Sequence, residues 1–343
     1  MSHPDHDNTD FIFAVVCAGG DSRLLSDLLD SLETNSDAST IAPHQICVVE
    51  NTTPPHDDQV KRLCHTRPNV TLIRPGKNFG YGAAINLAAE SLPNNRNSSA
   101  QPSWLIVCNS DLIFPPDSFT ALRSAVKQQD DDRVGLIAPR LLDEQEDTHQ
   151  HEPAKTQPSI GKFPTLWSLL SGKLRNRRTR KYIKSPTLRT KVDWATGACL
   201  AVRLDAFREV GGFDHGFFLD YEDVDLCKRL ASENWTRIFD PSWKVIHRHP
   251  HAQNRNPNFD RLIHTRASLI RYFVKHRTRW ELALLSTAYR LSIILHKRNH
   301  PMQSAWRAGI NELRKSSKPN SPAIGISERP GKPPPNLKAD RLD

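Results

Sequence analysis

The chain has 343 residues and a formal net charge of +9, and hydrophobic residues make up 37% of it, below the usual fraction of about 45–50%. Its length fits one large α/β domain with an appendage, or about two or three ordinary domains. No apolar run reaches the roughly 18 residues of a membrane-spanning helix, and the polar, acidic start lacks the pattern of a secretory signal. The 6 cysteines show no CxxC spacing, so we expect buried, reduced thiols in a reducing compartment rather than a disulfide or zinc framework.

The charge is unevenly distributed along the chain. Residues 173–191 carry nine basic side chains and no acid, and residues 261–315 carry twelve Lys or Arg and two acids. Subtracting +9 and +10 from the total of +9 leaves −10 for the remainder. The two basic segments therefore predict an anionic partner, the alternative being a solvated loop and a polar helix face.

Short apolar runs alternate with amphipathic segments over the first 240 residues. The expected strands are 11–18, 45–50, 70–74, 103–109 and 134–140, and the expected helices between them are 22–32, 57–64, 82–91 and 118–128. Val- and Ile-rich strands separated by amphipathic helices predict βαβ units and a mostly parallel sheet. Ligands of such sheets bind beyond the carboxyl ends of the strands.

The remaining chain is more varied. We expect a long basic loop over 143–191 with a short helix near 166–170, an apolar segment at 192–203 and a helix over 222–232. Residues 260–315 are predicted to be helical and basic. The polar residues 1–10 and the Pro-rich tail 316–343 are predicted to be disordered. The expected organisation is therefore one α/β domain over 11–259 followed by a helical region.

Polar motifs follow three of the expected strands. Asn109-Ser110-Asp111 offers oxygen ligands for a hard cation that could bridge a diphosphate, or forms an Asx turn. Glu50-Asn51-Thr52-Thr53 is placed to meet a base or ribose, although a turn explains it equally well. The small residues of 78–86 would let a helix N-terminus approach phosphate. This segment is not a dinucleotide fingerprint, and the chain has no P-loop.

The segment 211–226 is the richest in chemistry. Four of its acids, Asp220, Glu222, Asp223 and Asp225, fall within six residues where a helix begins. A capped helix with Asp220 as N-cap explains one or two of them. The neighbouring aromatic residues at 213, 217, 218 and 221 are candidates for a sugar platform, beside which a carboxylate could act as a general base. Downstream, one of the histidines at 247, 249 and 251 could complete a metal site, the alternative being surface histidines.

Six motifs occur in a characteristic order: VVENTT (48–53), NFGYGAAIN (78–86), NSDL (109–112), WATGACLAVR (194–203), GGFDHGFFLDYEDVDLCKRL (211–230) and VIH (245–247). Over about residues 11–275 the chain resembles the inverting family-2 glycosyltransferases of the GT-A fold. Within that family it is most similar to the bacterial rhamnosyltransferase-like branch, which builds polysaccharides and lipid-linked glycans. The resemblance implies a Rossmann-like nucleotide-diphospho-sugar transferase fold with a mostly parallel sheet.

The resemblance also implies site residues. Asp223, with Glu222 beside it, would be catalytic and would take the proton of the acceptor hydroxyl. Asp111, with His247, would hold the Mg²⁺ or Mn²⁺ cofactor that neutralises the leaving diphosphate. The implied nucleotide-binding residues are Glu50, Asn51, Asn78, Gly80, Asn86 and Asn109, and the implied acceptor-binding residues are Trp194, Gly197, Ala198 and Asp220.

The predicted function is metal-dependent, inverting transfer of a sugar from a nucleoside-diphosphate sugar, such as dTDP-rhamnose, to a glycan or lipid-linked glycan of the cell envelope. The alternatives are an inactive sugar-nucleotide binder and a basic nucleic-acid-binding protein, although no nucleic-acid motif accompanies the charge. The basic segments suit an anionic membrane surface bearing a polyprenyl-diphosphate-linked acceptor. We therefore expect a cytoplasmic protein, peripheral at the inner face of the membrane.

Overall fold

The computed structural model describes residues 11–17, 22–34, 45–54, 58–91, 103–128, 132–144, 154–169, 182–248, 259–295 and 303–316. The predicted disordered segment 1–10, nearly all of the predicted tail, part of the basic loop, and His249 and His251 lie outside the described residues.

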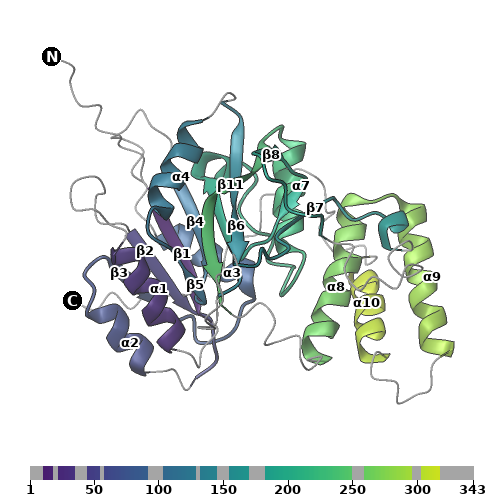
Figure 1. Ribbon diagram of the computed structural model, residues 1–343. Coiled ribbons are helices and arrows are strands. Elements are labelled where there is room, and N and C mark those ends of the chain that lie inside the picture. The colour runs from purple at the N-terminus through teal and green to yellow at the C-terminus, as the bar shows by residue number, and fades with distance from the viewer. Residues whose placement is uncertain are drawn as a thin grey trace.

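A nine-stranded mixed sheet forms the centre of the protein (Figure 1). Its order is β3 (Val70–Ile73), β2 (Gln45–Glu50), β1 (Phe11–Cys17), β4 (Trp104–Asn109), β10 (Cys199–Arg203), β6 (Val134–Leu142), β11 (Thr236–His247) and β5 (Leu112–Ile113), with β8 (Thr190–Lys191) beside β11. Strands β3, β2, β1 and β4 are parallel, and so are β6 and β11. Strand β10 runs antiparallel to both of its neighbours, β4 and β6. The predicted mostly parallel sheet is confirmed.

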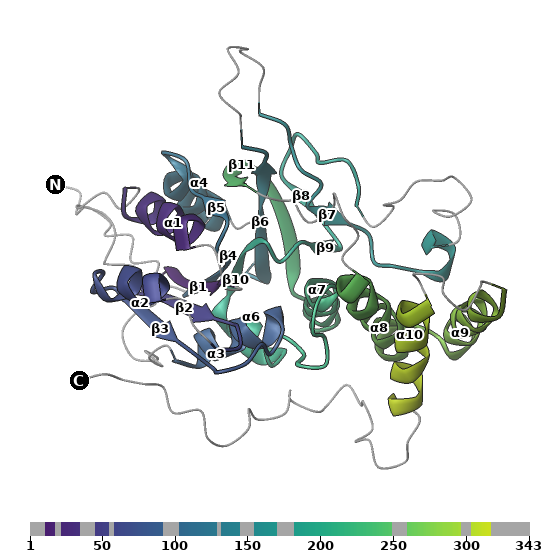
Figure 2. The same cartoon turned by 90° about the horizontal axis from the view of Figure 1, so that it is seen from below.

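Helices cover both faces of the sheet (Figure 2). On one side lie α1 (Ser22–Thr34), α2 (Asp58–His65) and α4 (Ser118–Lys127), whose apolar residues share one core cluster. On the other side lie α3 (Tyr81–Ser91), α6 (Leu204–Glu209) and α7 (Glu222–Ser232), which share the second cluster. Every residue of β1 is buried, as expected for a strand covered on both faces.

Three long helices stand beside this body: α8 (Phe259–His276), α9 (Arg279–Leu295) and α10 (Gln303–Ser316) (Figure 1). Apolar residues of α8, including Ile270 and Phe273, belong to the same core cluster as α3 and α7. The helical region is therefore packed onto the sheet domain through α8. Across the described ranges, no helix is long and apolar enough to cross a membrane.

The structure adds elements that the local pattern did not predict. Strand β11 is one, because Asp240 and Pro241 interrupt its apolar alternation and its pairing with β6 is irregular between Asp240 and Lys244. The predicted long loop also contains a strand that was not predicted, because β7 (Ile160–Gly161) lies within it and pairs with β9 (Trp194–Ala195). The predicted helix near 166–170 is present as a helical turn at 166–169. All six cysteines are free and buried, which confirms the predicted buried thiols.

Candidate active site

Strand directions bring three distant motifs to one edge of the sheet. Asn109 ends β4, and Asp111 follows it. Strand β10 is antiparallel to β4, so the residues that precede β10 lie at the edge where β4 ends. His247 ends β11 and pairs with Leu112 of β5, close to Asp111. The carboxyl edge of the sheet is thus the place where the predicted metal and acceptor motifs meet.

Asp111 and His247 face one another at this edge. The His247 Nε2 atom lies 3.3 Å from Asp111 Oδ1 and 3.5 Å from Asn109 Nδ2. On the other side of the ring, His247 Nδ1 lies 3.0 Å from Gln157 Oε1. Residues 109 and 247, which are 138 positions apart, are therefore neighbours in the folded chain, as the predicted metal site requires.

Gln157 fixes the orientation of the His247 ring. Its Nε2 donates to the main-chain oxygens of His247 at 2.8 Å and of Leu142 at 3.3 Å. Because these two carbonyls can only accept, they determine which end of the amide is the oxygen, and that oxygen faces His247 Nδ1. Nδ1 must then carry the ring hydrogen, and Nε2 is the nitrogen that can bind a cation. Metal-ligating histidines almost always donate their other ring N–H to an oxygen acceptor, and Gln157 Oε1 occupies that position for His247.

The donor set at this edge fits a divalent cation. A carboxylate oxygen and an imidazole nitrogen suit Mn²⁺, and the carboxylate also suits Mg²⁺. Within the described ranges, no three His, Cys, Asp or Glu side chains are grouped so that they could hold a metal alone. A cation at Asp111 and His247 would complete its coordination with diphosphate oxygens or water, which is a common arrangement for Mg²⁺ beside a nucleotide.

The predicted catalytic acids begin α7. Glu222 and Asp223 are its first two residues, and both are buried. Asp223 Oδ2 accepts the Gly197 N–H at 3.1 Å, and Oδ1 accepts the Val224 N–H at 2.8 Å. The carboxylate is therefore held in one orientation by the backbone rather than by a flexible side chain.

A short segment joins the metal end of the site to the acid end. The Asn109 N–H donates to Ala198 O at 3.0 Å, and the N–H of the preceding residue, Gly197, donates to Asp223 Oδ2. Tyr81, at the start of α3, donates its hydroxyl to Gly197 O at 2.6 Å. A Cβ at Gly197 would lie 3.2 Å from the Tyr81 ring, so the segment 197–198 is tightly packed against Tyr81. Burial raises the pKa of the Tyr81 phenol well above its usual value, which keeps it a hydrogen-bond donor.

The residues predicted to meet the nucleotide form a network among themselves. Asn51 Nδ2 donates to Asn78 Oδ1 and to Gly80 O, both at 3.1 Å, and Asn51 Oδ1 accepts the Phe79 N–H. Glu50 is fully buried, and its Oε2 lies 2.7 Å from Arg74 Nε. These contacts fix the loop beyond β2 and β3, and the nucleotide-binding roles of Glu50, Asn51, Asn78 and Gly80 stay predictions.

The small residues of 78–86 serve a close approach between two protein segments. Gly80 has φ of +88°, and a Cβ there would lie 2.4 Å from Phe218 O; a Cβ at Gly82 would lie 2.7 Å from Phe213 Cβ. The side-chain amide of Asn86 makes two hydrogen bonds with the main chain of Phe213: its Nδ2 donates to Phe213 O at 2.8 Å, and its Oδ1 accepts the Phe213 N–H at 2.9 Å. The sequence suggested a close approach to phosphate, whereas these contacts are made with the loop that leads into α7. The nucleotide role of Asn86 also stays a prediction.

The aromatic platform is a wrong prediction for three of its four members. Phe213, Phe217 and Tyr221 are buried in the core with α3, α7 and α8. Only Phe218 of these four is partly exposed, and its ring lies 4.4 Å from the His264 ring. Phe213 packs against Tyr81 and Phe207, whereas Phe217 and Tyr221 lie against Arg271 and Tyr272 of α8. Trp194 is likewise buried, with its Nε1 donating to Lys162 O at 2.9 Å.

Of the four acids at the start of α7, Asp220 and Asp225 bond to α8. Asp220, with φ of +62°, does not cap α7; its carboxylate accepts from Arg261 at 3.1 Å and from Thr265. The N-cap position is held by Tyr221, with no side-chain cap bond. The acceptor-binding roles of Trp194, Gly197, Ala198 and Asp220 are not decided by these contacts and stay predictions.

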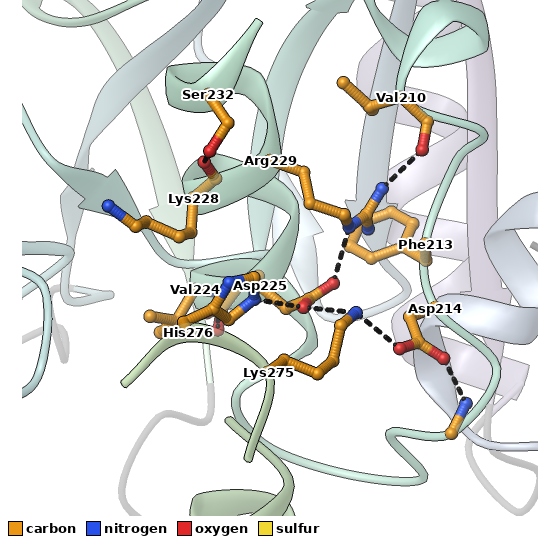
Figure 3. Close-up of polar contacts among 12 residues, drawn as sticks. Val210, Phe213, Asp214, Val224, Asp225, Lys228, Arg229, Ser232, Lys275 and His276 are labelled. Carbon is orange, nitrogen blue, oxygen red and sulfur yellow. Dashed lines mark hydrogen bonds and ion pairs between the residues drawn. The ribbon is translucent and has the colours of Figure 1, made fainter. Parts of the chain in front are cut away.

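Asp225 is the centre of a buried ion-pair network (Figure 3). Its Oδ2 lies 2.8 Å from Arg229 Nε, and its Oδ1 lies 2.7 Å from both Lys275 Nζ and His276 Nε2. Lys275 also pairs with Asp214 at 2.6 Å. Burial alone raises the pKa of Asp225, but Arg229, the His276 hydrogen bond and Lys275 outweigh it and hold this pKa well below its usual range. Part of the positive charge of α8 is therefore paired with the chain's own acidic segment, and an anionic partner of the basic segments stays a prediction.

Sequence reasoning missed Gln157 and Arg74. Gln157 lies in the predicted loop, 90 positions from His247, and a single glutamine carries no local pattern. Arg74 directly follows β3, so its position at a strand end was the one available signal.

A sheet with a parallel half, and with the Asp111–His247 pair and the buried Asp223 at its carboxyl edge, agrees with the GT-A fold that the resemblance implied. The sequence model described as Glycosyl transferase family 2 matches residues 15–211. The chain belongs to glycosyl transferase family 2, and the predicted fold class and enzyme class, a glycosyltransferase, are confirmed.

Similar proteins agree with this assignment. The N-acetylglucosaminyl-diphospho-decaprenol L-rhamnosyltransferase of Mycobacterium tuberculosis is 33% identical over 226 residues, which cover 63% of this chain and 71% of that protein. Rhamnosyltransferase WbbL of Escherichia coli is 26% identical over 71% of this chain and 86% of its own length. A crystal structure of GalNAc-T7 with UDP, GalNAc and Mn²⁺ superposes with a TM-score of 0.50 at 14% identity, over 70% of this chain and 43% of that one. This last likeness concerns the fold alone.

Proposed function

We propose that the protein transfers a deoxysugar, rhamnose, from its dTDP-linked form to a hydroxyl of a lipid-linked glycan, with inversion and with the help of Mg²⁺ or Mn²⁺. One observation carries the proposal: Asp111 lies beside His247, and the segment 197–198 links the neighbouring Asn109 to Asp223 by main-chain hydrogen bonds. The relatives named as rhamnosyltransferases support the sugar, and the decaprenol-linked substrate in one of their names supports the acceptor class.

The chain's own residues account for the steps. Asp111 and His247 would hold the cation, which would supply charge neutralisation at the leaving diphosphate. The acceptor hydroxyl oxygen forms a bond to the anomeric carbon while the bond from that carbon to the diphosphate oxygen breaks. Asp223 receives the hydroxyl proton. Because attack and departure occur on opposite sides of the carbon, the configuration inverts. Gly197 and Val224 keep the receiving carboxylate in place during transfer.

The experiment combines nucleotide binding with transfer. Thermal shift would be measured for wild type with dTDP, UDP and GDP, each with and without Mn²⁺, and sugar transfer from dTDP-rhamnose to a short-chain polyprenyl-diphosphate acceptor would be followed by mass spectrometry. We expect dTDP to stabilise the protein most, and only with the metal. NMR of the product would show an anomeric configuration opposite to that of the donor.

Two isosteric variants separate the roles, and Asp30→Asn on the exposed side of α1 serves as the matched control. Asp111→Asn should lose metal-dependent stabilisation by dTDP. Asp223→Asn should keep that stabilisation and lose transfer by about 10²–10⁴-fold. Transfer by Asp223→Asn at the wild-type rate would refute Asp223 as the base, and stabilisation by dTDP without metal in Asp111→Asn would refute the metal site.

A further inference from the structure

Helix α9 presents an apolar stripe to solvent. Five of its large hydrophobic side chains are between 50% and 77% exposed: Trp280, Leu284, Leu291, Ile294 and Leu295. Their spacing places them within an arc of about 100° on the helix. The opposite side of α9, with Leu285 and Tyr289, is buried. In both views α9 is the helix farthest from the central sheet (Figures 1 and 2). Tyr289, on its buried side, lies against Gly309 of α10, so the exposed stripe faces away from the other helices.

A further exposed aromatic side chain lies near the first turn of α9. The Leu166 N–H donates to Glu281 Oε1 at 3.2 Å, which ties the turn at 166–169 to the start of the helix. Trp167, in that turn, is 76% exposed. Two exposed tryptophans therefore belong to segments that meet at one end of the stripe. Tryptophan favours the boundary between lipid and water.

The charges around the stripe have one sign. Among the described side chains of α9 and α10, every exposed charged group is an arginine: Arg279, Arg290, Arg307 and Arg314. The two acids of these helices are buried and paired, Glu281 with Arg277 at 2.7 Å and Glu312 with Arg271 at 3.4 Å. Arg279 and Arg290 are 11 positions apart, which is about three helical turns, so they flank the stripe on the same side.

We infer that this surface, defined by Trp167, Trp280, Leu284, Leu291, Ile294 and Leu295, seats the protein on an anionic lipid bilayer. An apolar helix face flanked by arginines matches a bilayer interface, in which apolar side chains enter the acyl boundary and cations meet anionic headgroups. The same surface of a second copy would bring like charges together. The inference rests on the proposed function in one respect: a lipid-linked acceptor would be met at this surface.

Helix α8 connects this surface to the candidate active site. Ser268 donates to Leu219 O at 2.9 Å, and Arg261 bonds Asp220. Both contacts are to the loop that leads into α7 and Asp223. A bilayer held by α9 would therefore have a fixed placement relative to the candidate base.

The test uses the full chain and vesicles, with no nucleotide present. Co-sedimentation would compare phosphatidylcholine vesicles with vesicles containing phosphatidylglycerol. Leu291→Gln combined with Ile294→Gln should weaken binding by about tenfold or more, since two apolar side chains no longer leave water. Arg279→Gln combined with Arg290→Gln should weaken binding to anionic vesicles by about fivefold per residue and leave binding to neutral vesicles unchanged. Leu188→Gln, an exposed leucine outside the surface, is the control and should bind as wild type does.

Equal binding by wild type and the Leu291/Ile294 variant would overturn the inference, as would equal loss in the Leu188 control. Light scattering could instead show a concentration-dependent dimer that the Leu291/Ile294 substitutions dissociate. That result would assign the surface to a second copy. Transfer to a short-chain, water-soluble acceptor keeps the two proposals apart. The Leu291/Ile294 variant should retain that transfer, whereas failure of the proposed function would abolish it in wild type as well.

Discussion

Replacing Asp225 with asparagine tests whether the buried ion pairs hold the helical region onto the catalytic motif (Figure 3). The carboxylate is 0% exposed, and each of its oxygens lies within 2.8 Å of a basic side chain. Asparagine preserves the volume but offers one acceptor oxygen. Its NH₂ group would face either Arg229 or the side with Lys275 and His276. The basic side chains on that side would lose an acceptor at a buried position.

Removing one partner of a buried ion pair costs about 3–5 kcal/mol. For 343 residues, an unfolding entropy of about 2.1 cal/mol/K per residue makes that free-energy loss a fall in Tm of about 4–7 °C. Asp30→Asn is the control, because Asp30 pairs with Arg67 on the surface and its side chain is 55% exposed. An exposed pair contributes about 0–1 kcal/mol, so this variant should melt within about 2 °C of wild type.

The sign of the pH dependence follows from the lowered pKa of Asp225. The carboxylate stabilises the fold at every pH above its unfolded pKa of about 3.9, and this stabilisation is lost as pH falls toward the folded pKa. The difference in Tm between wild type and Asp225→Asn should thus be constant from about pH 7 to 5 and shrink below about pH 4. Differential scanning calorimetry across this range would measure it. A shift no larger than that of Asp30→Asn would refute the reasoning.

Three further outcomes are expected. Gly82→Ala should lower the free energy of unfolding by about 1–3 kcal/mol, measured by urea denaturation, because its Cβ would lie 2.7 Å from Phe213 Cβ. Gln157→Leu should weaken Mn²⁺ binding, measured by titration calorimetry with dTDP, by about 10–100-fold, since the ring of His247 loses its orienting acceptor; unchanged binding would contradict this. Burial raises the pKa of Glu281, but hydrogen bonds outweigh it and lower it to about 2, so wild type should lose stability between about pH 4.5 and 2 and Glu281→Gln should show a flatter dependence of Tm on pH.

The sequence by itself determined the local elements and the motifs. Strand β2 and helix α7 begin and end where the pattern predicted, because burial on both faces of a strand or on one side of a helix is carried by neighbouring residues. Asp111 was singled out as a candidate at a strand end, and Asp223 as a candidate by the family resemblance, since strand ends and helix starts leave polar residues in short, recognisable groups. The family resemblance was carried by the order of these groups along the chain.

Only the tertiary structure decided which groups meet. Strand β10 lies between β4 and β6 in antiparallel orientation, and this placement brings Gly197 to Asp223 and Ala198 to Asn109. The same holds for Asp225, whose Lys275 partner lies 50 positions away. A residue type and its immediate neighbours cannot specify a partner that is set by the packing of distant helices. The aromatic residues 213, 217 and 221 were assigned to a surface for this reason, whereas α3 and α6 cover Phe213 and α8 covers Phe217 and Tyr221 in the folded protein.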